Sequence, residues 1–230
     1  MRIMIILILV FGFTSAQGFL HNMDGEVVDG NGEPILLRGF GLGGWLVPEG
    51  YMLHNQAWIE GFESPTDIEN HVVDLIGQDE ANDFWELYRA NYVAQADIDK
   101  IAEWGFNHIR VPFHYKQFYD STGTETPIGY AIVDELITWC QPHNIYIILD
   151  MHCAPGAQNG GPISDSDGIA RLWLEDSYKE LTIQIWKEIA TYYADHTLIA
   201  GYDLINEPVL PSGVSLEEFK QLYVDITEAI

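Results

Sequence analysis

The sequence predicts an α/β fold, a (β/α)8 TIM barrel of which the 230 residues cover about the first four β/α units after an N-terminal β-hairpin. Nearly continuous apolar strands alternate with helical patterns, which is typical of a parallel sheet covered by helices. The GFGLGGW stretch after the first strand lacks the glycine spacing of a dinucleotide-binding open sheet. Polar residues stand at the ends of successive strands, as the catalytic residues of a barrel do.

The predicted elements follow one another in a regular order. They are a hairpin over 27–37 with its turn at 29–32, strands over 35–42, 106–113, 145–152 and 198–208, and helices over 68–104, 132–140, 177–192 and 215–226. An Asp-Gly-Asn-Gly turn between short apolar runs indicates the hairpin. The first helical pattern ends at Gly105, the expected C-cap.

The later elements have boundary signals of their own. Pro112 is expected to end the second strand, because proline cannot donate a hydrogen bond to the ladder. The third strand is almost wholly apolar, as expected of a strand buried on both faces. The last two helices begin with capping-box spacings, one at Ser177 and one at Ser215.

Residues 1–16 have the layout of a secretory signal peptide. Arg2 supplies the positive start, an apolar run over 3–13 follows, and the small residues Ser15 and Ala16 precede the expected cleavage before Gln17. The apolar run is short for a membrane span, and an uncleaved anchor is the alternative. The sequence therefore predicts a secreted protein, extracellular or periplasmic, with no membrane partner after cleavage.

Charge and cysteine content exclude several classes of partner. The 35 acidic and 10 basic residues give a net charge of −25, which argues against nucleic acid and anionic membrane surfaces. Cys140 and Cys153 are expected to be free thiols, because a strand of roughly 25 Å runs between them. Two cysteines also argue against a structural zinc site.

The 230 residues are expected to contain only part of the barrel. A barrel has eight β/α units and typically about 250 residues. Four units are used by Ile230, where a helical pattern is still running. Residues 17–230 are therefore expected to form the N-terminal half of a truncated barrel, and a natural half-barrel that dimerises is the alternative.

Polar side chains gather where the predicted strands end. Arg110 ends the second strand, His152 the third, and Asn206 with Glu207 the fourth. Strand alternation directs Arg110 into the barrel, where a permanent cation needs an anion. A carboxyl group at such a mouth can give and take a proton, and an amide can bind a substrate hydroxyl. Trp45 follows the first strand, and its indole is suited to stacking on a sugar ring.

Each of these residues also has a structural interpretation. Asn206 and Glu207 would cap a turn, and Arg110 would hold the barrel together through a salt bridge. His152 would be a core histidine oriented by Asp150, or a metal ligand together with other strand-end carboxylates. Trp45, like other aromatic residues near a strand end, would belong to the hydrophobic core.

Four stretches together resemble one known family. LRGFGLGGWL, GFNHIRVPF, DMHCAPGAQNGG and GYDLINEP are similar, in order, to the first four strand ends of glycoside hydrolase family 5, the cellulase-like barrels. The opening and the APGAQNG stretch most resemble its exo-β-1,3-glucanase-like members. The resemblance covers most of residues 17–230, and four ordered motifs are more specific than any one of them.

The resemblance implies a retaining hydrolase of β-linked glucan, β-1,3 or β-1,4, as polysaccharide or oligosaccharide, and no cofactor or metal is expected. Glu207 corresponds to the general acid/base, and Asn206 to the residue that binds the sugar 2-hydroxyl. Arg110 and His152 correspond to residues around the nucleophile and the sugar at the cleavage point. Trp45 falls in the family's GGW stretch and is expected to bind substrate.

The resemblance also places an essential group outside these residues. The family's nucleophile is a second Glu at the end of the seventh strand, so the 230 residues alone are expected to be inactive and the full-length protein active. Two other classes of function are alternatives. A non-catalytic carbohydrate-binding barrel would keep the aromatic residues without needing Arg110, His152 and Glu207 together. A metal-dependent barrel hydrolase would use strand-end carboxylates and histidine as ligands.

Overall fold

The computed structural model of the protein describes residues 18–53, 62–120 and 122–230. The signal peptide predicted over 1–16 lies outside these residues. Within them, no helix combines the length and the apolar character needed to cross a membrane.

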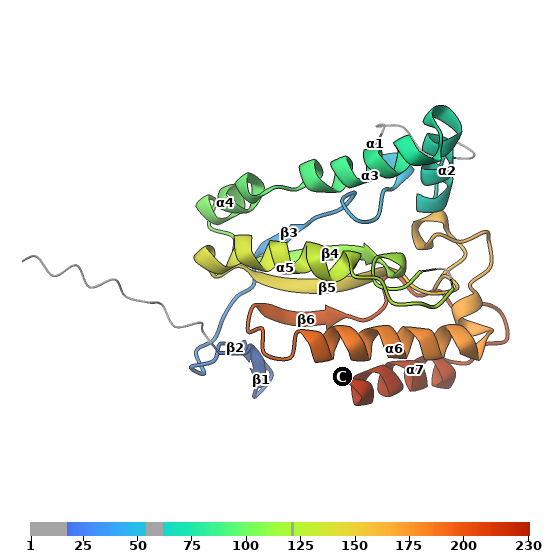
Figure 1. The fold of residues 1–230 in the computed structure, drawn as a ribbon. Coiled ribbons are helices and arrows are strands. Elements are labelled where there is room, and N and C mark those ends of the chain that lie inside the picture. The colour runs from blue at the N-terminus through green and yellow to red at the C-terminus, as the bar shows by residue number, and fades with distance from the viewer. Residues whose placement is uncertain (1–17, 54–61, 121) are drawn as a thin grey trace, which may run out of the picture.

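A parallel sheet flanked by helices forms the centre of the molecule (Figure 1). In order across the sheet its strands are β3 (Gly39–Gly41), β4 (His108–His114), β5 (Tyr146–Cys153) and β6 (Ile199–Asp203). An antiparallel hairpin of β1 (His21–Met23) and β2 (Glu26–Val28) precedes it. The helices are α1 (Gly50–Leu53), α2 (Pro65–Ile76), α3 (Gln78–Tyr92), α4 (Gln95–Glu103), α5 (Ile128–Cys140), α6 (Asp176–Tyr192) and α7 (Leu216–Ala229), with short 3-10 turns η1 (Tyr115–Gln117), η2 (Gln141–His143), η3 (Pro162–Ser164) and η4 (Arg171–Trp173). This arrangement confirms the predicted α/β fold with a parallel sheet.

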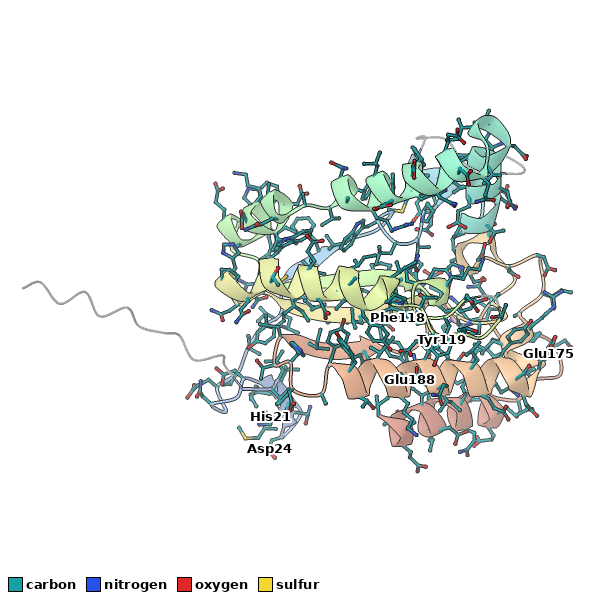
Figure 2. All side chains as sticks on the ribbon, in the orientation of Figure 1. His21, Asp24, Phe118, Tyr119, Glu175 and Glu188 are labelled. Carbon is teal, nitrogen blue, oxygen red and sulfur yellow. The ribbon has the colours of Figure 1, made fainter. Side chains whose placement is uncertain are left out.

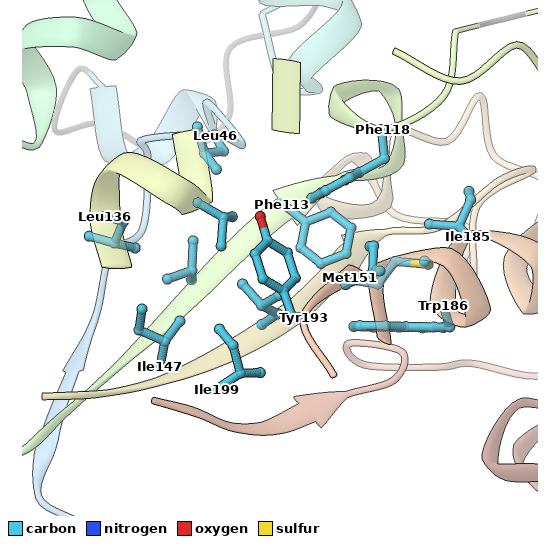
Figure 3. Packing of buried hydrophobic residues seen from close by; sticks show 14 of the residues in the cluster. Leu46, Phe113, Phe118, Leu136, Ile147, Met151, Ile185, Trp186, Tyr193 and Ile199 are labelled. Atoms are coloured by element: carbon cyan, nitrogen blue, oxygen red, sulfur yellow. The ribbon is translucent and has the colours of Figure 1, made fainter. Parts of the chain in front are cut away.

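The hydrophobic core lies between the sheet and helices α5 and α6 (Figure 3). Ile109 and Val111 of β4 are fully buried. The rings of Phe113 and Trp186 meet edge to face with their centroids 5.6 Å apart. The indole Nε1 of Trp186 also donates to the carbonyl oxygen of Leu204 at 2.9 Å, which ties α6 to the exit of β6. Each such side chain stabilises the fold by about 1.5–3 kcal/mol.

Strand alternation leaves the other face of the sheet polar. Along β4 the half-buried His108 and Arg110 alternate with the fully buried Ile109 and Val111, as predicted. The apolar residues therefore face the helices, and the charged residue faces the opposite side.

Hydrogen bonds connect α6 and the residue after it to the segment after β4 and to α5. The Tyr119 hydroxyl, in the segment after β4, donates to the carboxylate of Glu188 on α6 (Figure 2). Just beyond the last residue of α6, the hydroxyl of Tyr193 donates to Asp134 of α5 at 3.1 Å.

The predicted hairpin forms, and a tighter hairpin precedes it. Around the expected turn over 29–32, Val28 bridges Pro34 in the antiparallel sense, and the amide of Ile35 donates to the carbonyl oxygen of Val27 at 3.0 Å. β2 also pairs with β1 through a turn at Asp24 and Gly25, whose φ angles of 54° and 89° suit a two-residue hairpin. The pairing with β1 was not predicted, and residues 35–37 of the second arm are irregular rather than a strand.

The single helix predicted over 68–104 was wrong, since this stretch is divided among α2, α3 and α4. Gly77 separates α2 from α3 with φ at 89°, a conformation that side chains with a Cβ rarely adopt. Val93, with φ at −122°, extends the chain between α3 and α4. The predicted C-cap is confirmed, because Gly105 turns the chain after α4 with φ at 81°.

Pro112 does not end its strand. β4 runs on to His114. The amide of Leu42 donates to the carbonyl oxygen of Arg110 at 2.8 Å. The backbone N–H and C=O groups of Arg110 therefore point toward β3, and those of Pro112, two residues later, point to the same side. Because β3 ends at Gly41, the missing N–H of Pro112 removes no ladder bond.

One of the two predicted capping boxes forms. Ser215 Oγ accepts from the amide of Glu218 at 3.2 Å, and the Glu218 carboxylate accepts from the amide of Ser215 at 2.7 Å. The box predicted at Ser177 was wrong, because α6 already begins at Asp176 and has no side-chain cap.

Both cysteines are buried free thiols at the ends of regular elements. Cys140 is the last residue of α5 and Cys153 the last residue of β5. Burial raises the pKa of the Cys140 thiol to about 12 and that of Cys153 well above its ordinary value. Cys153 Sγ donates to the carbonyl oxygen of Ile163 at 3.2 Å.

Asp165 joins three segments that are distant in sequence. Its carboxylate accepts from the amide and hydroxyl of Thr66 at the start of α2, at 2.8 and 2.6 Å. It also accepts from His114 Nε2 at the end of β4 and from Lys116 Nζ, each at 3.0 Å. Burial alone would raise the pKa of Asp165, but these hydrogen bonds and charges outweigh it and hold the pKa well below its usual range. Burial lowers the pKa of His114, so its ring donates as a neutral imidazole.

Replacing this carboxylate should destabilise the protein in a pH-dependent way. We expect Asp165→Asn to lower the free energy of unfolding by about 1.5–3 kcal/mol at pH 7, since the substitution removes the charge that strengthens the hydrogen bonds of Thr66, His114 and Lys116. A carboxyl group with a depressed pKa contributes stability above its unfolded pKa of about 3.9 and loses it as the pH falls further. Urea unfolding of both proteins between pH 3 and pH 7 measures this difference.

The wild-type and Asp165→Asn proteins should therefore differ most at pH 5–7, and the difference should begin to shrink below about pH 4. The control is Asp167→Asn, whose carboxylate is 62% exposed, and it should change stability by less than about 0.5 kcal/mol. A difference that stays constant across the whole pH range would contradict the role given to Asp165.

Candidate active site

The guanidinium of Arg110 connects the carboxyl ends of three neighbouring strands. Its Nε and Nη2 donate to the Asp203 carboxylate of β6 at 3.0 and 2.8 Å. Nη2 also lies 2.8 Å from Asn206 Oδ1 and 2.9 Å from the Asp150 carboxylate of β5. One cation thus faces two carboxylates and an amide oxygen, which satisfies a charge that burial would otherwise destabilise.

Asp150 and His152 form the second part of this cluster. Asp150 is fully buried, and burial raises its pKa although His152 and Arg110 act in the opposite direction. His152 Nδ1 lies 2.7 Å from Asp150 Oδ2. This bond assigns the ring proton to Nδ1, so that Nε2 can accept from Asn206 Nδ2 at 3.4 Å. Asp150 therefore orients the imidazole, as expected from the sequence.

Asn206 and Glu207 lie just beyond the last residue of β6. The buried Asn206 continues the sheet edge, because its amide donates to the carbonyl oxygen of Met151 in β5 at 3.1 Å. At Glu207 the chain leaves the sheet with φ at 43°, in the left-handed region, and the residue is exposed. The charge of Glu207 raises the pKa values of Glu49 and Tyr51, after burial as the main cause, so its carboxyl lies near the cluster.

Glu49 is a site residue that was not predicted from the sequence. It is only 5% exposed, and its carboxylate lies 3.9 Å from His152 Nε2. Burial raises its pKa. The available signal was its position shortly after the first strand, in the GWLVPEG stretch, where a carboxylate reaches the same end of the sheet as Glu207.

Trp45 lies elsewhere. Its side chain is 3% exposed, and its Nε1 donates to the carbonyl oxygen of Arg89 in α3 at 2.8 Å. It lines a cavity of about 850 Å³ together with residues of α2, α3 and α5, including Trp85 and Trp139. Its described contacts are thus with helices rather than with the Arg110 cluster.

The structure therefore brings together Arg110, His152 and Asn206 in one hydrogen-bonded cluster, with Glu207 directly beside it. Such a cluster can hold a sugar ring through donors and acceptors of fixed orientation and can offer a carboxyl group for proton transfer. Among the residues that the structure describes, no group of three His, Cys, Asp or Glu side chains could hold a metal ion.

Comparison with known proteins connects this site to a family. The family model described as Cellulase (glycosyl hydrolase family 5) matches residues 66–230, more than half of the chain. A β-xylosidase of Phanerodontia chrysosporium is 35% identical over 190 residues, which cover 81% of this chain and 38% of that protein. A probable glucan 1,3-β-glucosidase A of Aspergillus niger is 28% identical over 189 residues, which cover 82% of this chain and 45% of that protein.

Solved structures agree in fold. The crystal structure of rutinosidase from Aspergillus niger superposes with a TM-score of 0.68 at 21% identity, covering 84% of this chain and 57% of that one. The β-glucanase of Saccharophagus degradans gives a TM-score of 0.58 at 19% identity, covering 94% of this chain and 51% of that one. The chain spans less than half of the length of the two curated relatives. Its parallel strand-end cluster and the family match over residues 66–230 lead to one conclusion: the chain belongs to glycoside hydrolase family 5.

Proposed function

We propose that the full-length protein is a retaining glycoside hydrolase that cleaves the β-glucosidic bonds of a β-glucan, β-1,3 or β-1,4 linked. The observation that carries this proposal is the convergence of Arg110, His152 and Asn206, with Glu207 beside them, at one end of a parallel sheet. Glucan 1,3-β-glucosidases among the relatives support the glucan substrate.

In the proposed reaction Glu207 is the general acid/base. Its carboxyl group protonates the departing glycosidic oxygen while a carboxylate nucleophile attacks the anomeric carbon, and the carbon–oxygen bond breaks. In the second step Glu207 takes a proton from water, which attacks the same carbon and releases the nucleophile. The nucleophile would come from another part of the protein, about 5–5.5 Å from Glu207.

The surrounding residues bind and orient the sugar in this proposal. Asn206 Oδ1 is held by Arg110, so the amide is fixed and Nδ2 is directed toward His152 and the substrate 2-hydroxyl. His152 is held by Asp150 at Nδ1, and its Nε2 faces Asn206 Nδ2. Arg110 would also keep the nucleophile ionised. Trp45 contributes from the helix side, as support for the loop after β3 rather than as a stacking platform.

We also propose that the sheet is part of a closed (β/α)8 barrel, with residues 17–230 as its N-terminal half. The support is that helices cover one face of the parallel sheet while the other face carries Arg110, Asp150 and Asp203. A barrel interior is the environment in which such charges meet at strand ends.

The alternatives from the sequence are separated by two assays. Release of reducing sugar from laminarin or carboxymethyl-cellulose by the full-length protein is expected, and its absence would favour a non-catalytic carbohydrate-binding barrel. Activity that persists in EDTA is expected as well, and loss of activity on chelation would favour a metal-dependent hydrolase.

Replacing the acid/base should remove hydrolysis and keep binding. We expect Glu207→Gln in the full-length protein to lower kcat on laminarin by about 10²–10⁴-fold, because general acid/base catalysis contributes this much. Binding of the glucan should be largely unchanged, since the amide preserves shape. The control is Glu228→Gln, which removes one charge from an exposed position on α7. Undiminished turnover by Glu207→Gln would refute the assignment.

We further propose that the protein is secreted after removal of residues 1–16. Expression of the full-length protein in a secreting host, followed by N-terminal sequencing of the exported product, should give a chain that begins at Gln17. A chain that still begins at Met1 and stays with the membrane fraction would instead indicate an uncleaved anchor.

A further inference from the structure

The loop between β5 and α6 places two buried amide side chains directly against the segment that carries Glu207. Gln158 is fully buried and Asn159 is 5% exposed. Both interact with main-chain groups at the exit of β6, so they act on the chain path rather than on a ligand. We propose that Asn159 is a positioning residue that holds the backbone of Glu207 and thereby aims its carboxyl group; this rests on the proposed function.

Gln158 fixes the two strand exits against each other. Its Nε2 donates to the carbonyl oxygens of His152 and Asn206 at 2.6 and 2.9 Å. Its Oε1 accepts from the amide of Ala154 at 3.1 Å. Its own carbonyl oxygen accepts from the amide of Val209 at 3.1 Å. The loop therefore holds the chain on both sides of Glu207 through hydrogen bonds to Asn206 and Val209.

Asn159 binds Glu207 itself. Its Nδ2 donates to the carbonyl oxygen of Glu207 at 3.0 Å. The amide orientation is fixed, because Oδ1 accepts from the amide of Gly161 at 2.7 Å and from the hydroxyl of Ser164 at 3.0 Å. The side-chain oxygen of Asn159 thus accepts two hydrogen bonds, and its nitrogen donates one.

The Glu207 backbone needs such a partner. A φ of 43° is unfavourable for a residue with a Cβ, by roughly 1–2 kcal/mol. The following Pro208 also disfavours the right-handed helical conformation that Glu207 would otherwise adopt. The bond from Asn159 holds the carbonyl end of Glu207, while the bonds of Asn206 to Met151 and Gln158 hold the chain before it. Because the backbone is held on both sides, φ of Glu207 is restrained, and this angle sets the direction of the side chain relative to Asn206.

A misdirected acid affects some substrates more than others. An unactivated glucan requires a proton at the departing oxygen, whereas a 2,4-dinitrophenyl group leaves as a stable anion without one. If the carboxyl group of Glu207 is misplaced, kcat/KM for the glucan should fall while kcat/KM for the dinitrophenyl glycoside stays nearly unchanged. The reason is that kcat/KM reports the first chemical step. A general loss of folded protein would lower both values equally.

The test uses Asn159→Ala in the full-length protein, with kcat/KM measured on a laminari-oligosaccharide and on the 2,4-dinitrophenyl glycoside of the same sugar. We expect a fall of about 10–100-fold on the oligosaccharide and of less than about threefold on the activated glycoside. Asn159→Asp is the second variant, because it is isosteric and keeps the acceptor but loses the donor, and it replaces Asn159→Ala if that protein does not fold.

Ser166→Ala is the matched control. It removes a hydroxyl of the same loop, which bonds the carbonyl oxygen of Ile169 and the amide of Gly168, and it leaves the bonds of Asn159 in place. It should change both substrates by the same factor. Equal losses on both substrates in the Asn159 variants, or no loss, would overturn the proposal for Asn159. If Glu207→Gln itself shows no preference between the substrates, the proposed function fails instead.

Discussion

The site depends on one cation held between strands. Arg110 on β4 is paired with Asp150 on β5 and Asp203 on β6, and these carboxylates are themselves register partners in the sheet. A guanidinium at 31% exposure beside a fully buried carboxylate is stable only while the pairing is complete. A shift of one residue in any of the three strands would turn these groups toward the helices. The ion cluster therefore fixes strand register and, with it, the position of Asn206.

The loop after β5 connects the exit of β6 to α2 and to the end of β4. At one end its amides hold the exit of β6, and at the other Asp165 binds α2 and the end of β4. The loop is long and rich in glycine, but its main turns are specified by buried side-chain bonds rather than by regular structure. The strained backbone at Glu207 persists because its surroundings leave the carbonyl one bonded orientation.

Much of this was predictable, because periodicity and strand-end chemistry are local signals. The parallel sheet follows from the order of strands and helices, and the direction of Arg110 away from the helices and the pairing of His152 with Asp150 follow from alternation. What failed depended on distant contacts. β3 is shorter than the predicted 35–42, and Gly39 lies so close to His108 that no Cβ would fit. The locations of Trp45 and Glu49 required knowledge of where the chain after β3 packs.

The two thiols have a consequence for how the protein would be handled. Cys140 and Cys153 are inaccessible, and burial keeps both sulfurs protonated at neutral pH. Alkylating reagents and glutathione would accordingly find no thiolate on the native molecule. A chain that has not yet folded presents both sulfurs, so labelling by a maleimide reports the unfolded fraction. Under oxidising conditions, slow folding would leave both thiols exposed to oxidation for longer, whereas the folded protein would stay unchanged.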